Sequence, residues 1–157
     1  MTELNEIVPY VPDHSLPPAI IVDIDGTVAL RGDRSPYDET RVSEDRPNEP
    51  VIALIQQLWA AYMYADSLKI IFMSGRTEKC RQATEDWLDE NVGVMYAGLY
   101  MREEGDFRKD WLVKQELFDT FVRDRYNVLW VFDDRNSVVS MWRSMGLTCL
   151  QVADGNF

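Results

Sequence analysis

An apolar run over residues 19–22 ends in two aspartates that stand one residue apart and precede a glycine. Such a run is typical of a buried strand. Side chains alternate along a strand, so Asp23 and Asp25 would share a face if the strand stayed straight, while Gly26 allows a sharp bend. Paired carboxylates attract Mg²⁺, and backbone N–H groups beyond a turn can bind phosphate oxygens. The pattern indicates phosphoryl chemistry, with one acid attacking phosphorus and the other handling the proton. The alternative is an ordinary surface Asp-Gly turn.

Length and charge limit the protein classes to consider. A chain of 157 residues predicts one domain, because domains commonly run to roughly 100–200 residues. The formal net charge of −11 argues against a tight, sequence-independent nucleic-acid binder, which normally carries a basic surface. It leaves room for a transient contact with a nucleic-acid end through a local basic cluster and a metal ion.

Cysteine usage and the N-terminus predict a cytoplasmic protein. Cys80 and Cys149 are the two cysteines, too few for a disulfide framework, and a reducing compartment is the plain interpretation. The first residues form no signal peptide, and no apolar run approaches the roughly 20 residues of a membrane span. If a phage encodes the protein, the location is the host cytoplasm.

The chain divides into an N-terminal arm over residues 1–18 and one domain over residues 19–157. Four prolines exclude a regular helix from the arm. His14, the single histidine, lies in the arm and is expected to be a solvated residue without a catalytic role.

Apolar strand patterns alternate with helical patterns along the rest of the chain, which predicts βαβ units and a mostly parallel sheet with helices on both faces. Ligands bind outside the carboxyl ends of the strands of such sheets. The polar stretch from about residue 29 to 49 is long enough for a small flap but not for a cap domain. Strands are expected at 19–22, 68–73, 94–100, 128–132 and 148–152, and helices at 51–62, 77–88, 111–126 and 138–145.

Two further strand ends carry polar residues. Ser74, Gly75 and Arg76 follow the second strand, where a hydroxyl and a cation suit a phosphate contact. The alternative is a helix start at which Ser74 or Thr77 is the N-cap.

Asp133 and Asp134 follow the fourth strand, and two adjacent acids after apolar residues are costly unless a cation or hydrogen bonds compensate them. One of them beside Asp23 would complete a Mg²⁺ site, although helix N-capping by Asp134 or Asn136 is the alternative. Lys114 and Lys109 are both candidates to offset this negative charge, and Lys109 is the more natural surface residue.

In this order the pieces resemble motifs I to IV of the haloacid dehalogenase (HAD) superfamily: residues 23–27, Ser74, Lys114 and the pair 133–134. Segments 105–110, 114–118 and 149–157 further resemble the 3′-phosphatase domain of bacteriophage polynucleotide kinase. The resemblance covers roughly residues 19–157 and leaves the first 18 residues outside it.

The resemblance implies the residue roles. Asp23 matches the nucleophile that forms an aspartyl-phosphate, and Asp25 the general acid and base, whose pKa would have to be raised for it to hold a proton. Ser74, Arg76 and Lys114 complete the catalytic set. The expected substrate-binding residues are Ile24, Gly26, Thr27, Gly75, Arg102 and Arg135. The expected Mg²⁺ ligands are Asp23, Asp25 through its main-chain carbonyl, Asp133 and Asp134.

The expected activity is Mg²⁺-dependent removal of 3′-phosphate from nucleic-acid ends, because a site without a cap can admit a polymer end. A nucleotidase acting on 3′-nucleotides, and a non-catalytic module that binds nucleic-acid ends or a partner, remain alternatives. The chain contains no G-x-x-x-x-G-K-[ST] motif, so a kinase or ligase partner would be a separate polypeptide. Arg31, Arg34, Arg76, Arg102, Arg108 and Lys109 are expected to form a local basic funnel.

Overall fold

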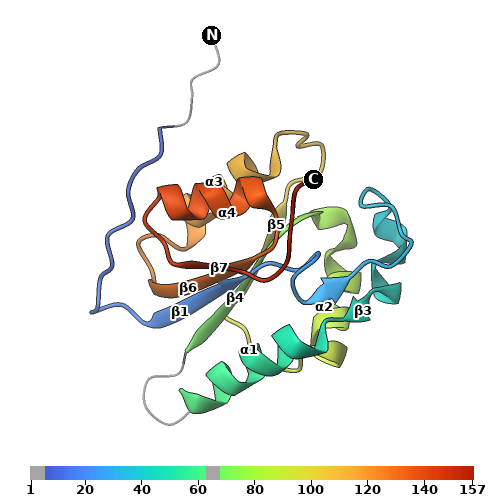
Figure 1. Ribbon diagram of the computed structural model, residues 1–157, viewed down its shortest axis with the longest axis horizontal. Coiled ribbons are helices and arrows are strands. Elements are labelled where there is room, and N and C mark those ends of the chain that lie inside the picture. Colours follow the sequence, from blue (N-terminus) through green and yellow to red (C-terminus); the bar gives the residue numbers. More distant parts are fainter. Residues whose placement is uncertain (1–5, 63–67) are drawn as a thin grey trace.

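The computed structural model describes residues 6–62 and 68–157. Its main sheet has five parallel strands in the order β5-β4-β1-β6-β7 (Figure 1). The predicted α/β fold with a parallel sheet is confirmed. The strands are β1 (Pro18–Val22), β4 (Lys69–Thr77), β5 (Gly98–Arg102), β6 (Asn127–Asp133) and β7 (Cys149–Gln151).

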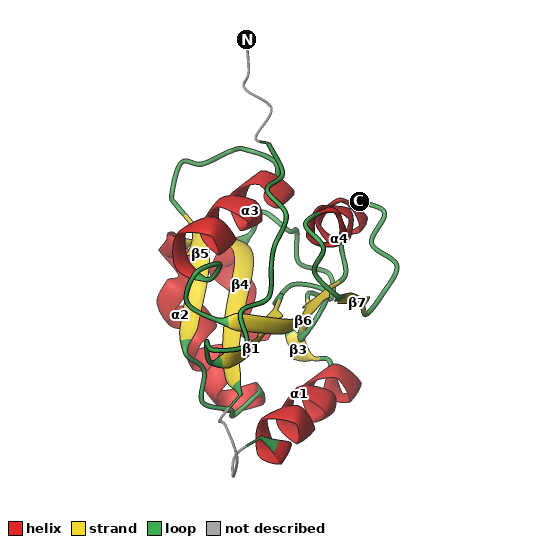
Figure 2. Ribbon diagram, turned by 90° about the vertical axis from the view of Figure 1, so that its left-hand side faces the viewer, coloured by secondary structure: helices red, strands yellow, loops and turns green. Residues whose placement is uncertain are grey.

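Helices cover both faces of the sheet, as Figures 1 and 2 show. Alternate residues of β1 separate into two apolar clusters: Ile20 packs on one face and Ile21 on the other. The face of Ile20 carries α1 (Glu49–Ala61) and α2 (Arg81–Asn91), and the face of Ile21 carries α3 (Asp110–Phe121) and α4 (Asn136–Ser144). None of the described helices combines the length and apolarity needed to cross a bilayer.

The position of β1 at the centre of the sheet explains where polar residues meet. Val22, its last residue, pairs with Phe72 of β4 and Phe132 of β6. Because all three strands run in the same direction, the residues that follow them leave the sheet at one edge. We call this the carboxyl edge.

A small flap follows β1, in the polar stretch where the sequence predicts one. It contains β2 (Ala29–Leu30), the 3₁₀ segment η1 (Glu39–Glu44) and β3 (Arg46–Pro47). β2 and β3 pair in antiparallel fashion as a separate two-stranded sheet.

Two predicted boundaries are wrong around Thr77. β4 continues through Ser74, Gly75 and Arg76, because β5 pairs with both Ser74 and Thr77 across an irregularity in the register. The expected helix from 77 starts later: residues 78–80 form the 3₁₀ turn η2 (Glu78–Cys80), and α2 begins at Arg81. Thr77 is not a side-chain cap, since its backbone N–H and hydroxyl both donate to the carboxylate of Glu39 in the flap.

The N-terminal arm contributes to the core. Residues 6–17 contain no helix or strand, in agreement with the proline pattern. Tyr10 is nevertheless buried, and its ring packs edge-on against Phe118 with 5.6 Å between centroids. Its hydroxyl donates to the Tyr126 carbonyl at 3.1 Å and accepts from the Val128 N–H at 2.8 Å.

Candidate active site

Asp23 lies directly after β1, buried at the centre of the carboxyl edge. Lys114 of α3 is also buried, and its Nζ lies 2.6 Å from Asp23 Oδ1 and 2.8 Å from Asp133 Oδ2. The hydroxyl of Thr27 donates to Asp23 Oδ2 at 2.8 Å. Both oxygens of Asp23 therefore have a fixed partner, so the carboxylate is held in one orientation.

Three buried carboxylates gather here. One oxygen each of Asp23, Asp133 and Asp134 lies within 4.8 Å of the others. The approach of Asp134 depends on Gly26, which has φ +84°, because a Cβ at residue 26 would lie 2.1 Å from Asp134 Oδ2. This explains the glycine after the two aspartates, since any larger residue would displace the Asp134 carboxylate.

The cluster is short of positive charge. Burial raises the pKa of the Asp23 carboxyl, although the positive charge of Lys114 acts to lower it. Burial and the charge of Asp133 raise the pKa of Asp134 to about 6. Burial disfavours the Lys114 ammonium, but Asp133 and Asp23 hold its pKa well above the usual value. One ammonium thus faces three carboxylates, and carboxylate oxygens are the ligands that Mg²⁺ prefers, so the donor set fits a divalent cation.

The side chain of Asp25 belongs to a different charge network. β1 ends at Val22, so the two aspartates do not continue a straight strand. Arg76 binds the Asp25 carboxylate through Nε and Nη2, each at 2.9 Å, and Arg34 Nη2 approaches it at 3.1 Å. Asp25 is not one of the three clustered carboxylates, and its main-chain carbonyl stays a predicted metal ligand.

The same two arginines share a second acid, Asp45, at the end of η1. Arg34 binds it through Nε at 2.9 Å and Nη2 at 2.7 Å, and Arg76 Nη2 lies 2.7 Å from it. Burial works against the charge of Asp25, but Arg76 and then Arg34 hold its pKa below the usual value. The expectation of a raised pKa is therefore wrong for this arrangement, because two guanidinium groups stabilise the carboxylate.

Removal of Asp45 should destabilise the fold. In the Asp45→Ala protein two buried arginines lose a shared carboxylate, and we expect the free energy of unfolding to fall by about 3–5 kcal/mol. Glu44→Ala is the matched control, because the Glu44–Arg41 pair is largely exposed and worth roughly 0–1 kcal/mol. Urea unfolding of both proteins compares them. Equal midpoints would show that Asp45 adds nothing to stability.

Backbone N–H groups of the turn after β1 donate to carbonyls of the same turn. Gly26 N–H donates to the Ala29 carbonyl at 2.8 Å, and Thr27 N–H donates to the Ile24 carbonyl at 3.2 Å. The backbone groups of Gly26 and Thr27 expected to bind phosphate are therefore engaged within the turn. The Ile24 side chain is buried in the core.

Ser74 and Gly75 lie on β4 beside this turn. Ser74 is buried, and its hydroxyl accepts the Arg76 N–H at 3.2 Å. Gly75 is required by Asp110 of α3, since a Cβ at residue 75 would lie 2.2 Å from Asp110 Oδ1. Arg102 donates to the Gly75 carbonyl at 2.9 Å and to Asp110 at 3.2 Å, so it joins β4 to the start of α3.

Four of the six cations predicted to form a basic funnel are paired with acids: Arg34, Arg76, Arg102 and Arg108. Arg34 and Arg76 are buried and neutralised by aspartates. Arg108 points its charge at Asp106 and Glu116, at 2.7 and 2.5 Å. The cause is that each of these cations has an acidic partner from the same loop or a neighbouring element.

Arg135 is more available than the other arginines of the site. It follows the clustered aspartates, and a third of its side chain is exposed. Its Nη1 lies 3.7 Å from Asp110 Oδ2, and Asp110 Oδ2 lies 3.8 Å from Lys114 Nζ. Arg135 is therefore two contacts away from the ammonium beside Asp23.

The sequence interpretation missed two acids. Asp45 sits in a polar segment where it resembles any solvated residue, and nothing local marks it. Asp110 could have been found, because it stands four residues before Lys114, and residues at this spacing meet on one helix face.

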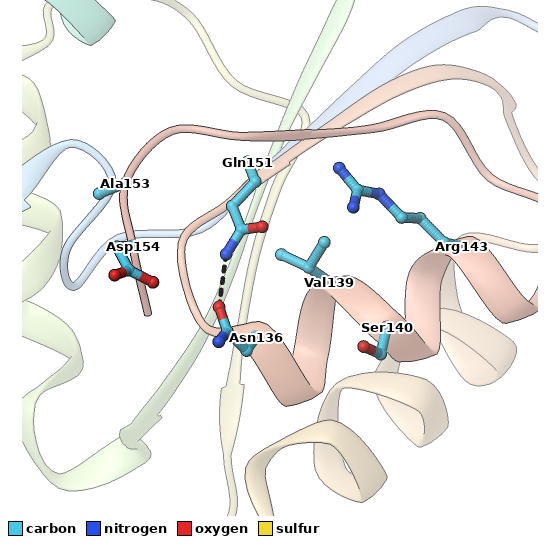
Figure 3. Close-up of a pocket in the computed structure, with 7 residues that line it drawn as sticks. All are labelled: Asn136, Val139, Ser140, Arg143, Gln151, Ala153 and Asp154. Carbon is cyan, nitrogen blue, oxygen red and sulfur yellow. Dashed lines mark hydrogen bonds between the residues drawn. The ribbon is translucent and has the colours of Figure 1, made fainter. Parts of the chain in front are cut away.

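A surface hollow between α4 and the segment after β7 is a separate feature (Figure 3). Gln151 donates to Asn136 across it at 2.7 Å. Its lining residues are Asn136, Val139, Ser140, Arg143, Gln151, Ala153 and Asp154. None of the predicted site residues lines it, so it is not the candidate active site.

Three solved structures share the fold, and two of them are also similar in sequence. Chains in two structures of the Pnkp1/Rnl/Hen1 complex, one described as an RNA repair complex, are 36% identical, each with a TM-score of 0.86. The matches cover 98% and 99% of this chain but 48% and 52% of those chains. A haloacid dehalogenase-like hydrolase, SP0104 from Streptococcus pneumoniae, is 14% identical with a TM-score of 0.54, over 85% of this chain and 83% of that one, which shows the fold alone.

Curated sequences lead to the same family. A putative bifunctional polynucleotide kinase/RNA ligase of Autographa californica nuclear polyhedrosis virus is 39% identical over 145 residues, which is 91% of this chain and 20% of the relative. The chain thus spans a fifth of that relative and about half of the solved chains. Residues 17–157 match the family described as the polynucleotide kinase PNKP phosphatase domain, and this chain belongs to that family.

Proposed function

We propose that this chain removes 3′-phosphate groups from nucleic-acid ends during end repair. The observation that carries the proposal is the cluster of Asp23, Asp133 and Asp134 around Lys114, in a chain of the PNKP phosphatase family. The relatives named for RNA repair and for polynucleotide kinase and RNA ligase functions favour RNA ends, and a kinase or a ligase as partner. A cytoplasmic location stays a prediction from the two free, buried thiols, Cys80 and Cys149.

The chemistry begins at Asp23. An oxygen of its carboxylate attacks phosphorus, an O–P bond forms, and the bond from phosphorus to the 3′-oxygen breaks. Asp25 gives a proton to the departing oxygen. It then takes a proton from water, whose oxygen attacks phosphorus and releases inorganic phosphate together with the restored Asp23 carboxylate. Thr27 and Lys114, bonded to the two oxygens of Asp23, orient the attacking carboxylate.

The arginines give Asp25 two alternative arrangements. Without substrate, Arg76 and Arg34 hold its carboxylate. A phosphate group presents oxygens that suit the same guanidinium fork. When Arg76 exchanges Asp25 for a substrate oxygen, the Asp25 carboxylate loses the partner that lowers its pKa most and takes up a proton from solvent, which it then gives to the leaving oxygen. Arg135, one third of whose side chain is exposed, is the second cation available to the incoming nucleic-acid end.

The carboxylates of Asp23, Asp133 and Asp134, with the main-chain carbonyl of Asp25, would hold Mg²⁺. The ion would neutralise the charge on the phosphate oxygens during transfer. Lys114 donates to both Asp23 and Asp133 and so holds these two expected ligands close together.

The proposal is tested with matched RNA and DNA oligonucleotides phosphorylated at either the 3′ or the 5′ end. We expect phosphate release from the 3′ end alone, dependent on Mg²⁺ and stopped by EDTA. Equal release from both ends would contradict the 3′ assignment. Faster turnover of free 3′-mononucleotides than of oligonucleotides would indicate a nucleotidase, and absence of release from every substrate would indicate a binding module.

A further inference from the structure

The exposed aromatic side chains of the described residues are three, Tyr37, Phe107 and Phe157, with 92%, 96% and 61% of their surface accessible. Each follows the carboxyl end of a strand: Tyr37 lies in the flap after β1 and β2, Phe107 after β5 and Phe157 after β7. We call these three residues the aromatic rim. The other described Phe, Tyr and Trp rings are buried or partly buried, so the three exposed ones all lie in segments that follow the carboxyl end of a strand.

Tyr37 stands on a turn that is tied to the site. Asp38 N–H donates to the Ser35 carbonyl at 3.0 Å and closes the turn. Arg34 Nη1 donates to the carbonyls of Ser35 and Asp38 at 3.3 and 3.1 Å. The same arginine binds Asp25 through Nη2. The turn is therefore held one side chain away from the proposed general acid, while the ring itself projects into solvent.

Phe107 is presented in the same way. Arg102 Nη1 donates to the carbonyls of Asp106 and Arg108, the residues on either side of Phe107, at 3.1 and 2.7 Å. Arg102 Nε meanwhile donates to the Gly75 carbonyl. Asp106 also accepts from the backbone and the side chain of Arg108. The loop is thus held on both sides of a ring that is almost fully solvated.

Phe157 lies against the guanidinium group of Arg135. Its ring centroid is 4.9 Å from Arg135 Cζ and 6.0 Å from Arg31 Cζ. Arg135 approaches Asp110, which stands beside Lys114. In each of the three cases an arginine joins an exposed ring to the surroundings of Asp23 or Asp25.

We propose that the aromatic rim stacks on the bases of the last nucleotides of the substrate strand, an inference that rests on the proposed function. Stacking is sequence-tolerant, because every base has a π face. A chain with net charge −11 gains little binding free energy from attraction to the phosphate backbone of a nucleic acid. Contacts with the bases are therefore the main source of binding free energy for the strand. Rings held on short, tied loops lose little conformational entropy when a base stacks on them.

The test compares two 3′-phosphorylated oligonucleotides, one with normal bases and one with abasic sites at its last two positions, and also p-nitrophenyl phosphate. For Phe107→Leu, Tyr37→Leu and Phe157→Leu we expect kcat/KM on the normal strand, relative to p-nitrophenyl phosphate, to fall by about 5- to 150-fold for each ring that stacks. Phe107→Trp, which keeps an aromatic ring, should keep the wild-type ratio. The abasic strand should be a poor substrate for every protein, and the leucine variants should not lower its turnover further.

Met95→Leu is the matched control, because Met95 is an exposed apolar residue that precedes β5, away from the carboxyl edge. Unchanged ratios in all three leucine variants would overturn the proposal and leave the rim as a contact surface for another protein. Binding of a fluorescein-labelled oligonucleotide, measured by anisotropy, tests stacking without turnover. If wild-type protein releases no 3′-phosphate, the proposed function fails, but loss of this binding in the leucine variants still supports stacking, and unchanged binding contradicts it.

Discussion

Asp23→Asn should abolish phosphate release from a 3′-phosphorylated oligonucleotide, lowering kcat by roughly 10⁴- to 10⁶-fold, the range seen when a reacting side chain is removed. The amide keeps the size of the side chain and an oxygen that can accept from Lys114 Nζ, so the fold should be retained. It lacks the anionic oxygen that bonds to phosphorus. Single-turnover assays measure the loss, and thermal unfolding checks the fold.

The covalent step has its own signature. Wild-type protein quenched in acid during turnover of a strand labelled with ³²P at its 3′-phosphate should carry hydroxylamine-sensitive label, and Asp23→Asn should carry none. Asp119→Asn is the control, because Asp119 is an exposed residue of α3 that pairs with Arg123 and not with any residue of the candidate site. Full activity of Asp23→Asn and Asp23→Ala would rule out attack by this carboxylate.

Lys114→Met is expected to lower both activity and the free energy of unfolding, the latter by about 3–5 kcal/mol. Methionine fills most of the space but removes the ammonium between Asp23 and Asp133. Buried carboxylates that lose their cation repel one another and have no water to solvate them. Urea unfolding without divalent cations measures the loss, and phosphate release is assayed in parallel.

Two comparisons sharpen this prediction. Lys109→Met changes an exposed lysine at the start of the same helix and should leave stability unchanged. The double variant Lys114→Met with Asp133→Asn should lose less stability than the sum of the single changes, because the second change removes a carboxylate that the first has stranded. Strict additivity would show that the ammonium does not act through Asp133.

The meeting of Asp23, Asp133 and Lys114 could be predicted from the sequence. Apolar runs locate buried strands, and parallel strands bring their carboxyl ends to one edge, so the acids after two runs converge. Lys114 is singled out by its resemblance to the motif III lysine, because a lysine on a predicted helix is by itself expected at the surface. The convergence of the acids depends on local periodicity and a single topological rule.

The network around Asp45 could not be predicted in this way. Its partners are 11 and 31 residues away, and the flap that carries it has little periodic structure. The prediction that a helix starts at Thr77 is wrong for a related reason. A local capping rule favours a helix start there, but the hydroxyl and the N–H of Thr77 both donate to a distant residue, Glu39. The direction of the Asp25 pKa shift follows from these same long-range contacts and was unpredictable without them.

The position of Tyr10 bears on where the folding unit starts. The family match begins at residue 17, yet this ring fills space among Phe118 and its neighbours and its hydroxyl bridges the approach to β6. The bounds of the family match are therefore narrower than the packed structure, in line with the two Pnkp1/Rnl/Hen1 matches, which cover 98% and 99% of this chain. A protein shortened to residue 17 would have a cavity beside Phe118, and the Tyr126 carbonyl and the Val128 N–H would lose their partner.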